Sequence, residues 1–216
     1  MLGKLFLCFS WCFCISVFAE GKVIYQNDFS SATRYEGEWF STDGSWTVDS
    51  VSGVLRQQIG APHRVGRTFL MQGLPANLEI TFDLTYLGGQ SLRSFGCGVM
   101  LRHPGPGKEG MYYQLSIPTS GQDGLELFKI NGIIADGKLT RKYQRLAMFD
   151  SPRSEQGRKC RVKISLTGNT FVCCLDGEEM FEYSHDDAQV TGRAFGFTTY
   201  GASVEIDNLT IKEIRE

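Results

Sequence analysis

The 216-residue sequence has little net charge and no concentrated basic stretch. Its 22 Lys and Arg residues and 24 Asp and Glu residues give a formal net charge of −2 at pH 7. The basic residues are scattered, with only a modest excess between residues 141 and 163. Proteins that follow a nucleic-acid backbone need a continuous basic patch or stripe. The composition therefore argues against nucleic acid as a partner.

The sequence also lacks the short motifs of several enzyme and metal-binding classes. It contains no phosphate-binding loop, no dinucleotide-binding glycine fingerprint and no Ser-His-Asp signature. No Cys-x-x-Cys pair and no His pairing at the spacing of zinc ligands is present. We therefore expect no zinc site and no nucleotide cofactor.

Long hydrophobic runs are missing, and the main apolar run lies at the N-terminus. Residues 5–18 are apolar and follow Lys4, and they are fewer than the roughly 20 residues that a membrane-spanning helix needs. Val17 and Ala19 occupy the positions that signal peptidase reads before a cut. We expect a signal peptide over residues 1–19, a mature domain over residues 20–216 and a periplasmic or secreted location without stable membrane insertion. The alternative is an uncleaved N-terminal anchor.

Few cysteines remain beyond this leader. The chain has seven cysteines, and an even number after cleavage invites disulfides in an exported protein. The strand pattern opposes them: in a hairpin that turns at Gly168 and Asn169, Cys160 lies well along the strand from Cys173, and Cys174 faces the other side. We expect mainly free thiols, three buried and one half-exposed, at Cys97, Cys160, Cys173 and Cys174.

Helical periodicity is the last notable absence. No segment keeps a 3.6-residue period over three turns, whereas alternation of apolar and polar residues recurs along the chain and is broken by Gly and Asx turns. This pattern predicts an all-β, two-sheet antiparallel sandwich. The alternation shifts phase at Asp207-Asn208, which indicates a bulge or a strand covered on both faces. The expected strands cover residues 23–29, 45–49, 53–58, 64–72, 78–87, 95–103, 111–117, 124–131, 136–140, 143–149, 159–167, 170–176, 179–184, 193–199 and 203–214.

Several segments resemble one superfamily. The stretch WFSTDGSWTVDSVSGVLRQQ looks like the opening of concanavalin A-like jelly rolls. The segments MYYQLSI, LELFKINGI, CRVKISLTGNTFVCCLDGEEMFEY and GRAFGFTTYGASVEIDNLTI then follow the order of its laminin-G-like members. The resemblance covers nearly the whole chain after the leader and implies a concanavalin A-like jelly roll. Most of the matching positions are structural.

Within that superfamily, the chain resembles bacterial 3-keto-disaccharide hydrolase-like domains. The resemblance rests on the order of EITFDLTY, SFGCGVMLR and YYQLSI. It implies a glycoside-acting enzyme in which Asp83 and Arg102 are the catalytic candidates. Gln114 stands where those domains carry an acidic residue.

Polar and aromatic residues on three expected strands form the candidate ligand site. Alternation places Asp83, Arg102, Tyr112 and Gln114 on the outward faces of strands that we expect to be neighbours. Arginine can hold vicinal hydroxyls or a carboxylate, and tyrosine can pack a sugar ring. The alternative is a solvated sheet face with a cross-strand Asp–Arg pair. We expect the site to extend to a rim and a flank at His103, Glu126 and Lys129.

Other residues offer weaker candidates. Asp28 and Asp207 lie in the first and last strands and could hold a structural calcium ion, although Asp28 could instead cap a turn. The Glu-Ile-Asp segment that ends at Asp207 lacks the second carboxylate of a retaining glycosidase, because Thr210 holds that position. His63 is a further loop candidate. Trp39 and Trp46 could stack on sugars, but their sequence context favours the core.

These observations favour an exported domain that recognises carbohydrate on a concave sheet. Two other classes stay open: a glycoside-acting enzyme, and a structural or protein-interaction domain without a sugar site. An enzyme requires a deep groove with convergent acidic and basic groups. A lectin requires a shallower groove with exposed aromatic residues, and a structural domain has a flat polar face.

Overall fold

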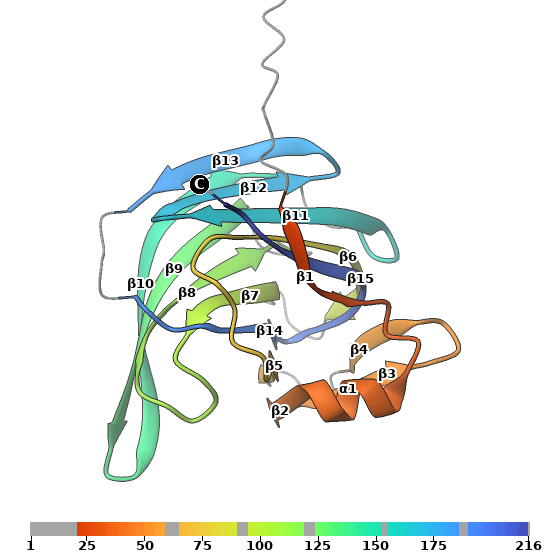
Figure 1. Cartoon of the computed structure of the whole chain (residues 1–216), viewed down its shortest axis with the longest axis horizontal. Coiled ribbons are helices and arrows are strands. Elements are labelled where there is room, and N and C mark those ends of the chain that lie inside the picture. The colour runs from red at the N-terminus through yellow and green to blue at the C-terminus, as the bar shows by residue number, and fades with distance from the viewer. Residues whose placement is uncertain are drawn as a thin grey trace, which may run out of the picture.

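The structure is a computed structural model that describes residues 21–58, 65–89, 95–118, 124–152, 155–185 and 190–215. Its strands form two antiparallel sheets packed face to face (Figure 1). This arrangement confirms the expected all-β jelly-roll sandwich. The proposed leader over residues 1–19 and His63 lie outside the described residues. No helix in the described ranges is long and apolar enough to cross a membrane.

We call the first layer sheet I. Its strand order is β13-β12-β11-β6-β15-β4-β3, and β1 pairs with β15 beside this path. The bounds are β1 (Lys22–Asn27), β3 (Ser45–Asp49), β4 (Val54–Gln58), β6 (Leu78–Gly89), β11 (Lys159–Thr167), β12 (Thr170–Leu175), β13 (Glu178–Ser184) and β15 (Ala202–Glu213).

We call the second layer sheet II. Its strand order is β10-β9-β8-β7-β14-β5-β2. The bounds are β2 (Trp39–Asp43), β5 (Val65–Leu70), β7 (Phe95–His103), β8 (Gly110–Ile117), β9 (Gly124–Ala135), β10 (Lys138–Asp150) and β14 (Ala194–Tyr200).

The core lies between the two sheets and follows the alternation of the sequence. In β6, every second residue from Leu78 to Tyr86 is buried, and the residues between them are half-buried on the outer face. In the β11–β12 hairpin, Ile164 pairs with Cys173 and Leu166 with Phe171, the register that the sequence predicts. Each such side chain contributes about 1.5–3 kcal/mol when it leaves water.

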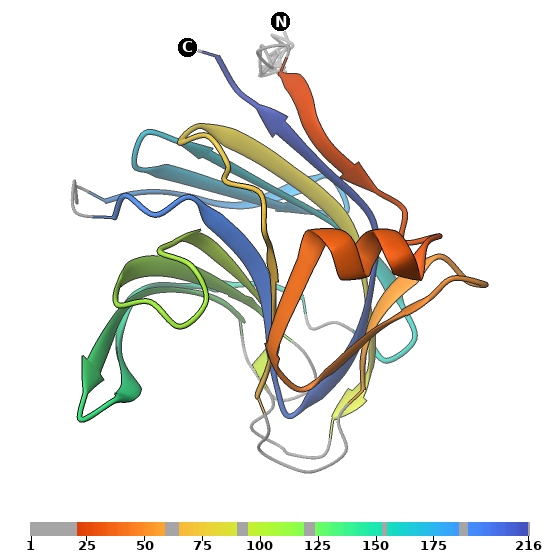
Figure 2. The same cartoon turned by 60° about the horizontal axis from the view of Figure 1, so that its bottom comes forward.

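The first and last strands are neighbours, as expected. β1 pairs with β15 in antiparallel register, so the two ends of the described chain lie on the same side of the molecule (Figure 2). The predicted irregularity in the last strand is a bulge: the register with β6 shifts between Asp207 and Thr210, and Asn208 has a φ of 50°. Asn tolerates this left-handed conformation better than most residues.

A short helix and one strand were not expected from the sequence. The helix α1 (Ala32–Glu38) begins at Ser31, whose side chain accepts a hydrogen bond from the Arg34 backbone N–H. The helix is too short to show a sustained period, and β2 follows it directly.

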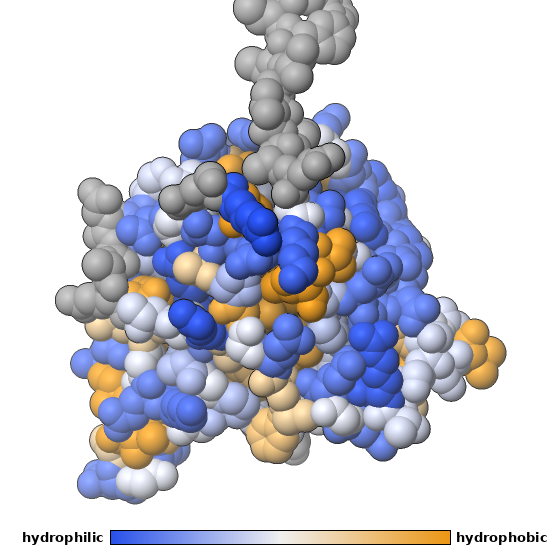
Figure 3. Space-filling model, viewed as in Figure 1, coloured by the Kyte–Doolittle hydropathy of each residue, from blue (hydrophilic) through white to orange (hydrophobic). Residues whose placement is uncertain are grey.

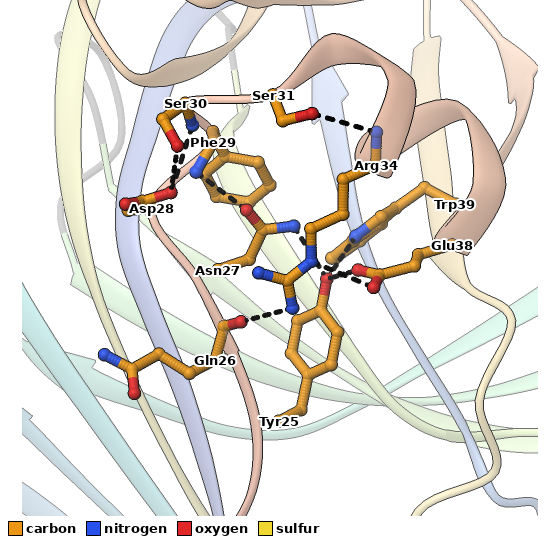
Figure 4. A network of polar contacts seen from close by, with 10 residues as sticks. All are labelled: Tyr25, Gln26, Asn27, Asp28, Phe29, Ser30, Ser31, Arg34, Glu38 and Trp39. Carbon is orange, nitrogen blue, oxygen red and sulfur yellow. Dashed lines mark hydrogen bonds and ion pairs between the residues drawn. The ribbon is translucent and has the colours of Figure 1, made fainter.

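A polar network around Tyr25 holds this segment against β1 (Figure 4). The Tyr25 hydroxyl donates to Glu38 at 2.7 Å and accepts from Asn27 and from Trp39 Nε1, both at 2.9 Å. Burial is the main cause that raises the pKa of Tyr25 to about 12; the hydrogen bonds from Asn27 and Trp39 oppose this rise, and Glu38 adds to it. Because all of these polar atoms are partnered, the network accounts for a buried tyrosine at the start of the fold.

The β9–β10 hairpin is longer than the sequence suggested. The expected strand ended at Asn131, but β9 continues through Gly132 to Ala135 and pairs with β10. The chain reverses at Asp136 and Gly137, which have φ values of 52° and 72° and suit a tight hairpin turn. The hairpin therefore projects beyond the other strands of sheet II (Figure 1). Hydrophobic surface gathers at its end and at the β3–β4 turn, where Val51 is exposed (Figure 3).

Both candidate tryptophans belong to the core. Trp39 stacks on Phe197 with ring centroids 5.9 Å apart, and Trp46 is 7% exposed. Their sequence context, which favoured the core, therefore predicted their position correctly. Neither tryptophan is available to stack on a ligand.

The four cysteines in the described part of the chain are free, as the strand phases predict. Cys97 and Cys173 are fully buried, and burial raises the pKa of both thiols above its usual range. One detail differs: the partly exposed thiol is Cys160, whereas Cys174 is nearly covered. Cys160 lies near the start of β11, where fewer side chains cover it.

Candidate functional site

The expected cluster of Asp83, Arg102, Tyr112 and Gln114 does not form. Asp83 lies on β6 in sheet I, whereas the other three lie on β7 and β8 in sheet II. Strands β6 and β7 are consecutive in sequence but belong to different layers. The expectation that these strands are neighbours is therefore wrong, and the proposed catalytic pair of Asp83 and Arg102 is split between the sheets.

Asp83 belongs to a charged network on the outer face of sheet I. It accepts hydrogen bonds from Arg161 and from Asn208 Nδ2, each at 2.8 Å, and Lys159 Nζ lies 3.7 Å away. Partial burial raises the pKa of Asp83, but the hydrogen bonds from Arg161 and Asn208 outweigh it and hold the pKa below its usual value. The cross-strand Asp–Arg pair thus exists, but its partner is Arg161 rather than Arg102.

Arg102 ties sheet II to a turn of sheet I. Its φ of 51° turns the chain out of the regular strand, and its side chain reaches the β11–β12 turn. There it donates to Asn169 Oδ1 at 3.2 Å, to the Ala76 carbonyl at 3.3 Å and to the Gly168 carbonyl. Burial lowers the pKa of Arg102. These contacts give Arg102 a structural role at the end of the sandwich.

A groove of about 380 Å³ crosses the outer face of sheet II. Strands β5, β7, β8, β9, β10 and β14 all contribute to it, with outward-facing residues at alternate positions. Gln114 is the one predicted site residue in its lining. Its lining also includes the side chains of Arg67, Ser116, Phe128, Tyr143, Thr198 and Tyr200.

Glycines on the central strand keep the groove open. Gly96 and Gly98 on β7 both face it. A methyl group at Gly98 would lie 2.6 Å from Thr198 Cγ2 and 3.2 Å from Gln114 Nε2, closer than packed atoms allow. The bare backbone of β7 therefore lets the polar groups of β8 and β14 approach one another across the floor.

The groove combines an exposed aromatic ring with fixed polar groups. Tyr143 is 55% exposed, and its ring stands edge-on to Phe128 with centroids 6.3 Å apart. Gln114 Nε2 donates to Ser116 Oγ at 3.3 Å. Arg67 is held by an ion pair of 2.6 Å with Asp43. Ordered donors beside an aromatic surface are the kind of lining that orients a polar ligand.

Predicted residues Tyr112 and His103 sit beside the groove and are buried. The His103 ring packs between Phe69 and Tyr112, with centroid distances of 4.7 and 4.3 Å, and its Nδ1 accepts a hydrogen bond from the Gly105 N–H. Burial, and after it the charges of Arg141 and Arg67, lowers the pKa of His103 to about 4. Burial raises the pKa of Tyr112. Both residues therefore support the face more than they present a free surface.

Glu126 and Lys129 do not share a surface. Glu126 faces the groove side and accepts from Arg145 Nη1 at 2.8 Å. Lys129 pairs with Tyr113, a core residue, and so faces the other side of the sheet. Residues three apart in a strand point to opposite faces. The expectation that both extend one surface is wrong for Lys129.

The two residues proposed for calcium have other partners. Asp28 Oδ1 accepts from the Ser30 N–H at 3.1 Å and from Ser30 Oγ at 2.8 Å, the turn-capping alternative. Asp207 pairs with Lys159 at 3.3 Å. Among the residues that the structure describes, no group of three or more His, Cys, Asp or Glu side chains is placed to hold a metal ion.

Arg67, Phe128, Tyr143 and Thr198 are groove residues that the sequence analysis did not select. Each occupies an outward position of an expected strand, which is the signal that could have found them. That signal also marks every outward residue of sheet I. It becomes specific only when the order of the strands is known.

The fold and groove define a concanavalin A-like jelly-roll sandwich. The carbohydrate-binding module CBM66 from Bacillus subtilis superposes with a TM-score of 0.60 at 19% identity, over 82% of this chain and 96% of that one. A Bacillus subtilis protein of unknown function with a galectin-like fold gives a TM-score of 0.70 at 13% identity, over 92% and 100%. The lumenal domain of VIP36, bound to Ca²⁺ and Man3GlcNAc, gives 0.62 at 12% identity, over 89% and 91%. No protein-family model and no curated protein sequence matches this chain.

Proposed function

We propose that this protein is an exported module that binds carbohydrate in the groove on the outer face of sheet II. The observation that carries the proposal is the pairing of the exposed Tyr143 ring with the polar floor formed by Gln114, Ser116 and Thr198. An aromatic face packs against the C–H side of a sugar, while amide and hydroxyl groups bond its hydroxyls. Two proteins of similar fold support this proposal: CBM66 is a carbohydrate-binding module, and the VIP36 domain is bound to Man3GlcNAc.

Binding, rather than hydrolysis, is the function that the groove supports. Retaining and inverting glycosidases place two carboxyl groups across the scissile bond. The described side chains that line the groove include no carboxylate. Asp83 and Arg102, the catalytic candidates of the sequence analysis, lie in different sheets.

The proposal predicts that one aromatic substitution removes binding without unfolding the protein. The protein lacking residues 1–19 is screened on a glycan array, and the affinity for the best ligand is measured by calorimetry. Tyr143→Ala should weaken that affinity by about 10-fold or more, since loss of a stacking ring costs one to a few kcal/mol. Gln114→Ala should weaken it by a similar factor through lost hydrogen bonds.

Gln144→Ala is the matched control, because Gln144 is the exposed neighbour of Tyr143 on the opposite side of β10. It should leave the affinity unchanged. Full affinity in both Tyr143→Ala and Gln114→Ala would place the ligand elsewhere on the protein.

A further inference from the structure

One end of the groove face is rich in hydrogen-bond donors. Arg141 lies on β10 opposite Gly132, on the same face as Tyr143. Its guanidinium lies near the buried Tyr112 hydroxyl, where it opposes the rise in the pKa of Tyr112 that burial causes. Gly132 pairs in turn with Gly110 on β8. Since neither glycine has a side chain, the long Arg141 side chain can cross these strands to reach Tyr112.

Arg67 approaches the same place from the other side of sheet II. Arg67 comes from β5 and Arg141 from β10, and β7 with His103 lies between these strands in the sheet order. Both guanidinium groups act electrostatically on His103, whose pKa they lower after the larger effect of burial. Both arginines therefore lie near the same buried imidazole, Arg67 as part of the groove lining.

The cations on this face exceed their acidic partners. Arg67 is paired with Asp43, and Arg145 is paired with Glu126. Arg141 has no carboxylate partner among the residues that the structure describes, and it lies near the Tyr112 hydroxyl.

His103, which lies near Arg141, adds a donor rather than a negative charge. His103 is neutral at ordinary pH and accepts the Gly105 N–H at Nδ1, so its own proton resides on Nε2. A partly buried cation that lacks an acidic partner has its charge unbalanced. A ligand that brings negative charge would complete the site.

We propose that the groove binds an anionic glycan, with Arg141 and Arg67 holding its carboxylate or sulfate group while a neighbouring sugar stacks on Tyr143. This inference rests on the proposed carbohydrate-binding function and names its ligand class. The planar guanidinium group can bind either anion through two parallel hydrogen bonds. The charged group would lie toward Tyr112, and the stacked ring toward Phe128.

The test compares charged and neutral forms of the same oligosaccharide. The carboxylate probe is an oligogalacturonide, with its fully methyl-esterified form as the neutral counterpart. The sulfate probe is a carrageenan oligosaccharide, with its desulfated form as the counterpart. Calorimetry measures each affinity for the wild type and for Arg141→Gln, Arg141→Lys and Lys142→Gln. Lys142 is the matched control, because it is the exposed next residue on β10 and faces the opposite side.

We expect one charged probe to bind at least about 10-fold more tightly than its neutral form, with a preference that weakens as salt is added. Arg141→Gln should remove most of that preference while keeping the melting temperature, and Arg141→Lys should keep part of it. Lys142→Gln should change neither. Which probe binds decides between carboxylate and sulfate.

Equal affinity for charged and neutral forms, unchanged by Arg141→Gln but weakened by Tyr143→Ala, would overturn the anionic inference and leave carbohydrate binding in the groove intact. Absence of binding to every glycan on the array and to all four probes would refute the proposed function, and the anionic inference with it.

Discussion

His103 should make the protein acid-sensitive in a range where most carboxylates are still ionised. The ring is 2% exposed between Phe69 and Tyr112. Burial, the main cause, and the charges of Arg141 and Arg67 lower its pKa from 6.5 to about 4. The unfolded chain therefore takes up a proton between pH 6.5 and 4 that the folded chain refuses. Stability rises with pH across this window and is lost as the pH falls through it.

The size of the effect follows from the shift. Lowering the pKa from 6.5 to about 4 corresponds to about 3 kcal/mol once the pH is below both values. Roughly 2–3 kcal/mol of this is already lost at pH 4.5. The variant His103→Asn keeps an acceptor for the Gly105 N–H but does not titrate. Its free energy of unfolding at pH 7 should be lower than that of the wild type because ring contacts are lost, yet it should fall much less between pH 7 and 4.5.

Urea unfolding at the two pH values, followed by tryptophan fluorescence, measures this difference because Trp39 and Trp46 are buried. The carboxylates whose pKa values are lowered, such as Asp83, contribute equally to both proteins and cancel in the comparison. If the wild type and His103→Asn lose the same free energy between pH 7 and 4.5, the buried neutral imidazole does not exist as described.

Four other features give expected outcomes. Gly98→Ala should lower the free energy of unfolding by about 1–3 kcal/mol in thermal melts, because its methyl group would lie 2.6 Å from Thr198 Cγ2, and an unchanged melting temperature would show that the floor relaxes freely. Arg102→Met should cost about 1–3 kcal/mol in urea titration by releasing its hydrogen bonds to the β11–β12 turn, and no loss would mean that the sheets are not tied there. A chelator should change neither the melting temperature nor the glycan affinity, because Asp28 and Asp207 have other partners. A loss of stability or affinity that added calcium restores would instead support a calcium site at these residues. Thiol titration under denaturing, non-reducing conditions should find free thiols at Cys97, Cys160, Cys173 and Cys174. Two missing thiols would reveal a disulfide.

The candidate site was only partly predictable. Gln114 was correctly placed on an outward face that forms a groove, and Tyr112 faces the same side. Lys129 was assigned to the wrong face, although counting three residues from Glu126 along the strand would have corrected it. Tyr143 was overlooked because an exposed tyrosine on a long, charged hairpin looks like ordinary surface until its neighbours across the sheet are known.

The sequence by itself determined most of the strand pattern of this protein, although not helix α1, strand β2 or the length of the β9–β10 hairpin. Alternation in each segment fixed which side chains face the core, because the period of a strand is two whatever it pairs with. The tight β11–β12 hairpin was predicted, and the irregularity at Asn208 was predicted as one of two alternatives, since both depend on residues close together in the chain.

Only the tertiary structure decided which outward faces meet. Strands β6 and β7 follow one another yet enter different sheets, and this separates Asp83 from Gln114. The strand order depends on pairings between distant segments, and those pairings are chosen by how both hydrophobic faces are buried together. An outward residue carries no mark of the sheet it will join, so the groove becomes defined only when the two layers close on the core.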